Sequence, residues 1–314
     1  MLKKYTDKLR RFFGKDVLRE IGNLKAEVVE VQNNVLHEIG LLSERLNEIK
    51  LPSMNDRVYI GKDYCPTRHA TWDYECLAAT IIKDRSTLFI DVGANKGQSV
   101  MLAYKYINNV NVLSYEPLKS CCDPYLKGLT YVYPGFRYKN IAMSSSDDPI
   151  IIQEIKQFSG LSSSLKIKED YKYFQESINT NVKEFHEVQS TTLTKEQREW
   201  DTYNAEIRML KIDTQGTELR ILKEAPNLLR SGYFDIVKIE VMMIEKYEKS
   251  DNYLDVLNFM NECGYIIYNI VSVYRDLNGT HVPVLSLEYG HNNEYDITFV
   301  HKERYVKMQM EAKQ

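Results

Sequence analysis

Residues 88–97 read LFIDVGANKG, and this stretch decides the fold. It begins as an almost entirely apolar run, as buried strands do. Gly93 and Gly97 then bracket a short polar turn, where glycine lets the backbone bend tightly and approach a ligand. Residues 97–107, GQSVMLAYKYI, continue with apolar side chains at helical spacing. A buried strand that turns directly into a helix predicts the first unit of a βαβ fold.

The same alternation of apolar runs and helical patterns continues along the chain. Such alternation predicts a doubly wound, mostly parallel α/β sheet of the Rossmann-like kind. The polar, Ser/Thr-rich segment 144–206 is too long for a plain connection and predicts an insertion or lid. We expect the last strand, DITFV, to join the sheet at an edge. The predicted strands are 88–92, 110–116, 138–143, 207–213, 235–241, 265–271 and 296–300.

The composition narrows the class of protein. The chain has 314 residues, is 43% apolar and carries a formal charge of −3, so it can bury a core and does not attract nucleic acid as a whole. Its five cysteines form no CxxC pair and are odd in number. The N-terminus has no apolar signal-peptide region, and no run of 18 apolar residues exists. We expect a cytoplasmic protein without a nucleic-acid partner.

The N-terminal segment has its own pattern. Apolar residues recur every three or four positions, which predicts a coiled-coil seam with one stutter and hence a homo-oligomer. The alternative is one amphipathic helix lying on the catalytic domain. Pro52 ends the pattern, so we expect a helical arm over 1–52 and a domain over 53–314. The seam comprises Ile21, Leu24, Val28, Val31, Val35, Ile39, Leu42, Leu46 and Ile49.

The first 15 residues are strongly basic, with six Lys or Arg against one Asp, and include Leu9, Phe12 and Phe13. Two interpretations fit. Such a helix can make peripheral contact with anionic lipid at the inner face of the membrane. A solvated helix end is the commoner explanation of a charge run.

A cofactor site is predicted at the turn 91–97. In open α/β sheets, nucleotide-like ligands bind at the carboxyl ends of the strands. The turn is not the dinucleotide motif GxGxxG, because the next glycine after Gly93 is Gly97, four positions on. It suits an aminocarboxypropyl chain, whose ammonium Asp91 can meet directly or through water. Glu116 ends the second strand, where an acid receives ribose hydroxyls.

Position alone places the third-strand residues at the rim of the adenine pocket. The full set of residues that we expect around the cofactor is Asp91, Gly93, Ala94, Asn95, Gly97, Gln98, Glu116, Pro117, Asn140, Ile141, Ala142 and Asp213.

Four motifs in order make the sequence resemble the FkbM-type methyltransferases: FIDVGANKGQ (89–98), SYEP (114–117), LKIDTQGTELRILKEA (210–225) and VKIEV (237–241). The resemblance covers roughly residues 57–303 and includes the closing strand EYDITFV (294–300). It implies S-adenosylmethionine as cofactor and methyl transfer to oxygen, commonly a sugar hydroxyl of a polysaccharide, glycolipid or secondary metabolite. Two departures, Thr194 where the family often has Asp and Glu224 where it often has Gly, put the edge of the acceptor pocket in doubt.

Two rival functions remain open at this point. A nicotinamide-dependent oxidoreductase shares the fold, but the tighter glycine motif is absent. The other rival function is a non-catalytic scaffold, in which a degenerate methyltransferase domain is part of a glycan-synthesis complex. Degeneracy is disfavoured because Asp91, Gly93, Gly97 and Glu116 are all present.

The acceptor side needs a group that takes the proton of a weakly nucleophilic hydroxyl. Asp213 ends the fourth strand and Glu240 lies in the fifth. Asp213 is the favoured base, and the pair is alternatively a divalent-metal site, which we do not favour. Glu218, one turn into the next helix, is expected to stabilise that helix N-terminus. No HExxH motif or histidine pair indicates zinc.

Two histidines are alternative bases, because imidazole titrates near neutral pH. His186 lies in the insertion and His69 precedes the first strand, and each is also explained as an ordinary surface or packed histidine. The serine-rich stretch SGLSSSL (159–165) either closes over the cofactor or forms a plain turn.

Overall fold

A computed structural model describes residues 70–314, apart from 157–158, 169–182, 273–293 and 312–314. The predicted arm over 1–52, the boundary at Pro52 and the candidate base His69 lie outside the described residues. Within the described part of the chain, no helix has the length and apolar character needed to cross a membrane.

The centre of the domain is a seven-stranded sheet with the order β10-β11-β9-β8-β1-β2-β3. The five strands β3, β2, β1, β8 and β9 are parallel, whereas β11 is antiparallel to both of its neighbours. This is the predicted doubly wound, mostly parallel sheet. The strands are β1 (Thr87–Val92), β2 (Val110–Tyr115), β3 (Phe136–Lys139), β8 (Ile207–Ile212), β9 (Ile236–Met242), β10 (Tyr265–Ser272) and β11 (Glu294–His301).

The last strand is not at the edge, and that prediction is wrong. β11 lies between β9 and β10, and β10 is the edge strand. The inner position agrees with the burial of β11, because Ile297, Thr298, Phe299 and Val300 are almost completely buried. A strand covered on both faces and paired on both sides gains more from apolar residues than an edge strand does.

The predicted strand 138–143 is also corrected, because the structure divides it. β3 ends at Lys139, and Ala142–Met143 forms a separate short strand, β4, that pairs with β7 (Ser190–Thr191). The break occurs at Asn140, which contacts the chain just after β2. Its side-chain amide donates to the carbonyls of Glu116 and Pro117, at 2.9 Å each, which turns the chain away from the sheet.

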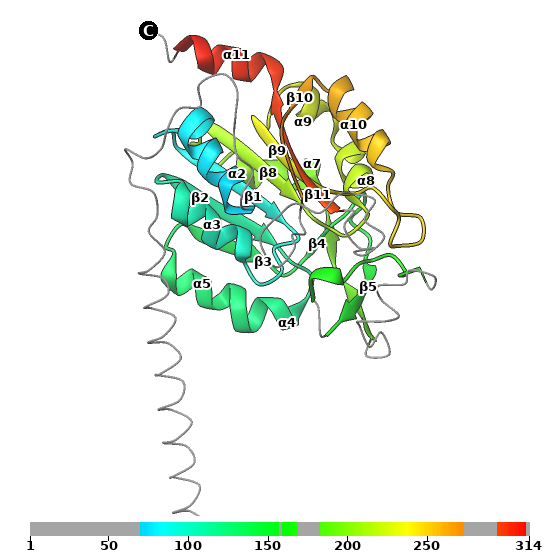
Figure 1. The fold of residues 1–314 in the computed structure, drawn as a ribbon. Coiled ribbons are helices and arrows are strands. Elements are labelled where there is room, and N and C mark those ends of the chain that lie inside the picture. The colour runs from blue at the N-terminus through cyan, green and yellow to red at the C-terminus, as the bar shows by residue number, and fades with distance from the viewer. Residues whose placement is uncertain (1–69, 157–158, 169–182, 273–293, 312–314) are drawn as a thin grey trace, which may run out of the picture. The chain divides into compact units, whose positions relative to one another are not determined.

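Helices cover both faces of the sheet (Figure 1). Alternate residues of β1 enter two separate cores, with Phe89 in one and Leu88 and Ile90 in the other. The first core includes α2 (Ala70–Leu77), a π-helical turn (Ala78–Ile82), α3 (Gln98–Tyr106), a second π-helical turn (Cys122–Leu126) and α11 (Lys302–Glu311). The second includes α7 (Leu193–Trp200), α8 (Glu218–Glu224), α9 (Pro226–Arg230) and α10 (Tyr253–Glu262).

The insertion 144–206 contains a hairpin in its described part. β5 (Ile150–Ile155) pairs antiparallel with β6 (Lys183–Val188), and a 3-10 turn over Ser159–Leu161 follows β5. Ile152 packs with Leu118 and Cys121. Leu118 precedes the short helix α4 (Lys119–Cys121) and Cys121 ends it; α5 (Lys127–Val132) follows. The hairpin therefore lies beside the end of β2, at the carboxyl edge of the sheet.

A buried ion pair fastens α2 to the sheet. Asp73 on α2 is fully buried and lies 2.7 Å from the Lys238 ammonium of β9. Thr298 of β11 and Asn269 of β10 also donate to the Asp73 carboxylate, at 2.7 and 3.2 Å. Burial opposes ionisation, yet the Lys238 ammonium and these hydrogen bonds hold the pKa of Asp73 below its usual value. One helical side chain thus contacts three neighbouring strands.

Candidate active site

The turn after β1 approaches the turn after β8 closely. Gly93 has a φ of 77°, and a Cβ at this position would lie 1.9 Å from the carbonyl oxygen of Asp213. Only glycine fits that distance. The turn occupies the point between β1 and β8 where the strand order reverses, which is where open α/β sheets bind ligands.

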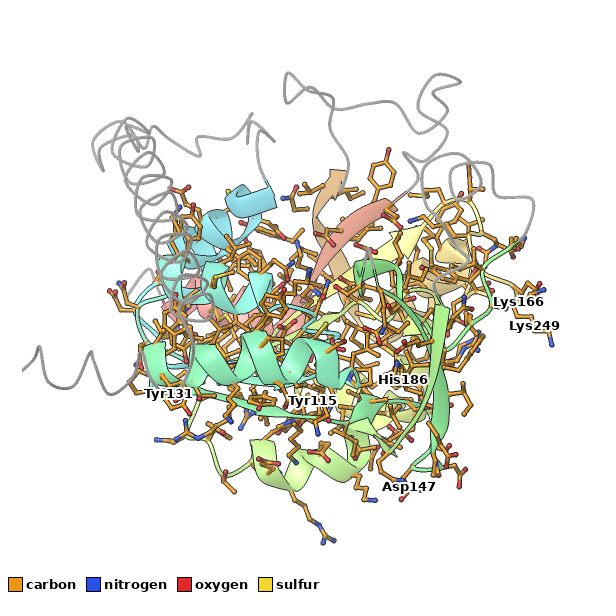
Figure 2. The ribbon with its side chains drawn as sticks, turned by 90° about the horizontal axis from the view of Figure 1, so that it is seen from below. Tyr115, Tyr131, Asp147, Lys166, His186 and Lys249 are labelled. Atoms are coloured by element: carbon orange, nitrogen blue, oxygen red, sulfur yellow. The ribbon has the colours of Figure 1, made fainter. Side chains whose placement is uncertain are left out.

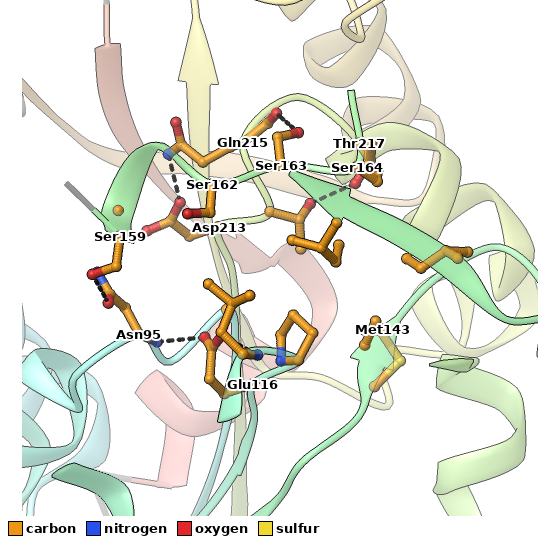
Figure 3. Close-up of a pocket in the computed structure, with 18 residues that line it drawn as sticks. Asn95, Glu116, Met143, Ser159, Ser162, Ser163, Ser164, Asp213, Gln215 and Thr217 are labelled. Atoms are coloured by element: carbon orange, nitrogen blue, oxygen red, sulfur yellow. Dashed lines mark hydrogen bonds between the residues drawn. The ribbon is translucent and has the colours of Figure 1, made fainter. Parts of the chain in front are cut away.

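Glu116 lies directly after β2 and faces this turn (Figure 3). Its two carboxylate oxygens accept hydrogen bonds from the backbone N–H groups of Asn95 and Leu118, at 2.7 and 2.9 Å. The side chain is only 4% exposed. Burial raises the pKa of Glu116 to about 7, although the two backbone donors oppose the shift.

Asp91 is placed differently from the expectation. It is fully buried beneath the turn and does not line the pocket. Ser114 donates to its carboxylate at 3.3 Å, and the Lys211 ammonium lies 3.7 Å away. Burial raises the pKa of Asp91. Asp91 therefore does not line the pocket, and its contact with the cofactor, directly or through water, stays a prediction.

Lys211 is a functional candidate that the sequence reasoning missed. This nearly buried lysine on β8 lies between Asp91 and Asp213, 3.1 Å from the latter. Burial disfavours its charge, but the Asp213 and Asp91 carboxylates outweigh burial and raise the pKa of Lys211. The sequence feature that could have identified Lys211 is a lysine inside an apolar strand, two residues before an acid.

Asp213 and Glu240 are joined by a residue that the sequence analysis did not select. The side-chain amide of Gln215 donates to Asp213 Oδ1 at 3.0 Å and to Glu240 Oε1 at 2.5 Å. The Asp213 side chain is 25% exposed and lines the pocket. Burial raises the pKa of Glu240 well above its usual value, and the nearby Asp213 and Asp296 carboxylates add to this. Glu240 therefore keeps its proton to higher pH than an ordinary glutamate.

The serine-rich stretch lies against the same pocket (Figure 3). Ser159 donates to the Asn95 side-chain oxygen at 2.7 Å, and Ser163 donates to the Gln215 carbonyl at 2.8 Å. We call residues 159–165 the serine lid, because they connect the turn after β1 with the turn after β8 across the pocket.

Some of the residues predicted to bind the cofactor or act in catalysis line the pocket, and others do not. Gly93, Asn95, Glu116, Pro117, Ala142 and Asp213 line it. Asp91, Ala94, Gly97, Gln98, Asn140, Ile141 and Glu240 do not. The complete lining is Gly93, Asn95, Glu116, Pro117, Leu118, Ala142, Met143, Ile150, Ile152, Ser159, Gly160, Ser162, Ser163, Ser164, Asp213, Thr214, Gln215 and Thr217.

His186 is not brought to Asp213. It lies on β6 (Figure 2) and lines a neighbouring groove, with its Nε2 atom 2.7 Å from Glu154 Oε2. Within the described ranges, Glu154, Glu184 and His186 are the one group whose ligand atoms lie close enough to hold a metal ion. Glu184 also pairs with Lys156, so ion pairing accounts for the cluster. The alternative of a divalent ion held by the pair Asp213 and Glu240 stays a prediction.

The two departures from the family pattern contact each other. The backbone N–H of Thr194, at the start of α7, donates to the Glu224 carboxylate of α8 at 3.3 Å. Neither residue lines the pocket. The doubt that they raised about the acceptor pocket is thus not supported by their positions.

Comparison with known families identifies the domain. Residues 91–267, more than half of the chain, match the Methyltransferase FkbM domain. The chain belongs to the FkbM methyltransferase family. It is accordingly an S-adenosylmethionine-dependent methyltransferase, and the residues matched include every motif from Asp91 to the start of β10.

Solved structures similar to this FkbM methyltransferase include other methyltransferases. A putative S-adenosylmethionine-dependent methyltransferase from Listeria monocytogenes is 9% identical, with a TM-score of 0.38, 73% of this chain covered and 97% of that one. The precorrin-6y C5,15-methyltransferase of Geobacter metallireducens GS-15 is 8% identical, with a TM-score of 0.37 and coverage of 76% and 93%.

A third structure is the Burkholderia thailandensis 1,6-didemethyltoxoflavin-N1-methyltransferase, which was solved with 1,6-didemethyltoxoflavin and S-adenosylhomocysteine. It is 8% identical, with a TM-score of 0.37 and coverage of 74% and 79%. A comparison with curated proteins gives no significant match.

Proposed function

We propose that this FkbM methyltransferase transfers a methyl group from S-adenosylmethionine to a hydroxyl oxygen of a sugar or glycan, with Asp213 as the group that takes the proton. The observation that carries the proposal is the pocket at the strand-order reversal. There the glycine turn, Glu116 and Asp213 line one space, and the serine lid covers it.

The residues of the pocket fit the cofactor. Glu116 uses two acceptor positions on backbone donors, and a carboxylate has about four, so two remain for the ribose hydroxyls. Gly93 lines the pocket, and its lack of a side chain lets the turn after β1 pack against the Asp213 backbone, which brings both turns to the space proposed for the aminocarboxypropyl chain. Pro117 and Ala142 supply the apolar wall for adenine. Asp91 contributes indirectly, by holding Lys211 beneath Asp213.

Asp213 is the better proton acceptor of the two acids. Its carboxylate reaches the pocket, whereas Glu240 does not line it and has a pKa that burial raises well above its usual value. Held by these residues, S-adenosylmethionine would supply a methyl group to the acceptor oxygen, and the electron pair of the broken bond would stay on sulfur. The hydroxyl proton passes to the Asp213 carboxylate, which lies 3.1 Å from the Lys211 ammonium. Much of the remaining acceleration comes from orientation of the two substrates.

A groove beside the pocket supports a polyhydroxylated acceptor. It shares Met143, Ile150, Ser164 and Thr217 with the pocket and opens toward solvent. Its remaining wall is rich in hydroxyl groups and includes Ser144, Ser145, Ser146, Ile151, Leu165, Arg220 and Ile221. Hydroxyl and guanidinium groups are suitable partners for sugar hydroxyls. Together with the family resemblance, this wall favours a carbohydrate acceptor.

The test combines binding with transfer. We expect S-adenosylhomocysteine to bind the purified protein in calorimetry, and mass spectrometry to find a methylated sugar after incubation with S-adenosylmethionine and a glycan mixture. Asp213→Asn should lower kcat by about a hundredfold or more. Asp147→Asn is the matched control, because Asp147 is exposed at the periphery and pairs with Lys195 (Figure 2).

Two results would overturn the proposal. If calorimetry detects no binding of S-adenosylhomocysteine, the protein has no such cofactor site. A protein that binds it but methylates no hydroxyl in any glycan or other acceptor tested has lost catalysis, which favours the scaffold function instead.

A further inference from the structure

We propose that Gln215 is a positioning residue, which aims the Asp213 carboxylate for proton transfer and makes this aim depend on the serine lid. The inference rests on the proposed role of Asp213. Its elements are three: the amide between two acids, the backbone at Gln215, and the contacts that join Gln215 to the lid.

The first element is the amide. A primary amide nitrogen has two N–H donors, and Gln215 uses them on Asp213 and Glu240. Both bonds come from one planar group, so the two carboxylates are held at a fixed separation. Gln215 is only 7% exposed, which limits the access of water that would otherwise replace these bonds.

The second element is the backbone. Gln215 has a φ of 58°, in the left-handed region, which costs a residue other than glycine about 1–2 kcal/mol. Glycine would avoid this cost, and glycine does follow at 216 with a φ of 109°. Only a side chain of this length and chemistry at 215 reaches both acids. Strain of this kind is concentrated at functional sites.

The third element fixes which end of the amide faces the acids. The hydroxyl of Tyr247 has one proton, which it shares between two acceptors: Gln215 Oε1 at 3.0 Å and the carbonyl of Leu161 in the lid at 2.9 Å. A hydroxyl that donates to Oε1 leaves the nitrogen end directed at Asp213 and Glu240. Tyr247 is fully buried, so its position is set by packing against Ile155, Ile167 and Met242.

A second contact joins the lid to the same residue. Ser163 donates its hydroxyl proton to the Gln215 carbonyl at 2.8 Å. The lid therefore holds the backbone of Gln215 directly and its side chain through Tyr247. When the lid is displaced, the Gln215 backbone loses the Ser163 anchor, so the position from which its amide reaches Asp213 is no longer fixed. Proton transfer is thereby favoured only in the covered pocket, where water is excluded.

The test uses the isosteric variant Tyr247→Phe. We expect kcat to fall about fivefold to tenfold, as the loss of one hydrogen bond allows, with KM for S-adenosylmethionine within about twofold of the wild type. A structural defect would change both constants. Tyr233→Phe is the matched control, because the Tyr233 hydroxyl contacts Asp201, away from the pocket. Equal kcat values for the two variants would overturn the proposal.

Hydrogen exchange tests the coupling even if the enzyme transfers no methyl group. In the free protein, Tyr247→Phe and Ser163→Ala should each speed amide exchange in residues 159–165 and in 213–217, and Tyr233→Phe should not. Unchanged exchange in 213–217 contradicts the link between lid and acids. Failure to bind S-adenosylhomocysteine, by contrast, contradicts the proposed function and leaves this measurement to decide the coupling.

Discussion

The affinity for the cofactor product should rise with pH, because Glu116 titrates near neutrality. Burial sets the pKa of Glu116 at about 7, with the Asp91 and Asp213 carboxylates adding to the shift. Ribose hydroxyls donate hydrogen bonds, so they favour the ionised carboxylate over the neutral acid. Binding of S-adenosylhomocysteine should therefore select the ionised form and release protons around neutral pH.

The size of the effect follows from the populations. With a pKa of about 7, roughly a tenth of Glu116 is ionised near pH 6 and roughly nine tenths near pH 8, so the apparent Kd should fall about tenfold between them. In Glu116→Gln, the loss of a charged acceptor should cost about 2 kcal/mol near pH 8, or about thirtyfold in Kd. The pH dependence should disappear.

Calorimetric titration with S-adenosylhomocysteine near pH 6, 7 and 8, in two buffers of different ionisation enthalpy, measures both the Kd and the protons released. Glu218→Gln is a matched control. Burial likewise raises the pKa of Glu218 to about 7, but its carboxylate binds the N–H groups of Thr214 and Gly216 and does not line the pocket.

Glu218→Gln should keep the wild-type pH dependence of binding. The reasoning about Glu116 is refuted if Glu116→Gln retains the tenfold change in Kd, or if the wild type shows none.

The other predictions concern stability. The pKa of Glu218 is about 7 in the folded protein and 4.5 in the unfolded chain, so the wild type loses about 3 kcal/mol of stability as pH rises from about 4.5 to 7. Glu218→Gln should flatten this pH dependence of the unfolding free energy in denaturant titrations. Gly93→Ala should prevent folding or lower Tm by many degrees, since its Cβ meets a backbone oxygen at 1.9 Å; a normal Tm would contradict that packing. Tyr115→Phe should cost about 1–3 kcal/mol, because the buried Trp200 indole N–H loses its acceptor, and an unchanged midpoint would count against it.

Much of the fold was predictable because local patterns determine it. The apolar runs of β1, β8 and β9 are covered on both faces, and the glycine turn after β1 requires a positive φ. The order of the C-terminal strands was not predictable, because the residues of DITFV do not determine which strands lie beside it in the sheet. The break at Asn140 depends on carbonyls from a different strand end, which no local pattern reveals.

The site was predictable to the extent that its residues follow strand ends. Glu116 and Asp213 do so, and both line the pocket. The direction of a side chain at such a position is set by its neighbours, and this is why Asp91 was placed in the pocket while Lys211 and Gln215 were not selected. Their roles arise from charges and amides that meet across strands.

The contact of Asp73 with Lys238 determines where the chain can be shortened without destabilising the methyltransferase domain. A shortened chain that starts after α2 would leave the buried Lys238 ammonium with one counter-ion, Asp296, in place of two, and would remove the acceptor of the Thr298 and Asn269 hydrogen bonds. Truncations, protein fusions and purification tags should therefore join upstream of Ala70. The helix that precedes the first strand belongs to the smallest unit able to fold, although it contributes no residue to the pocket.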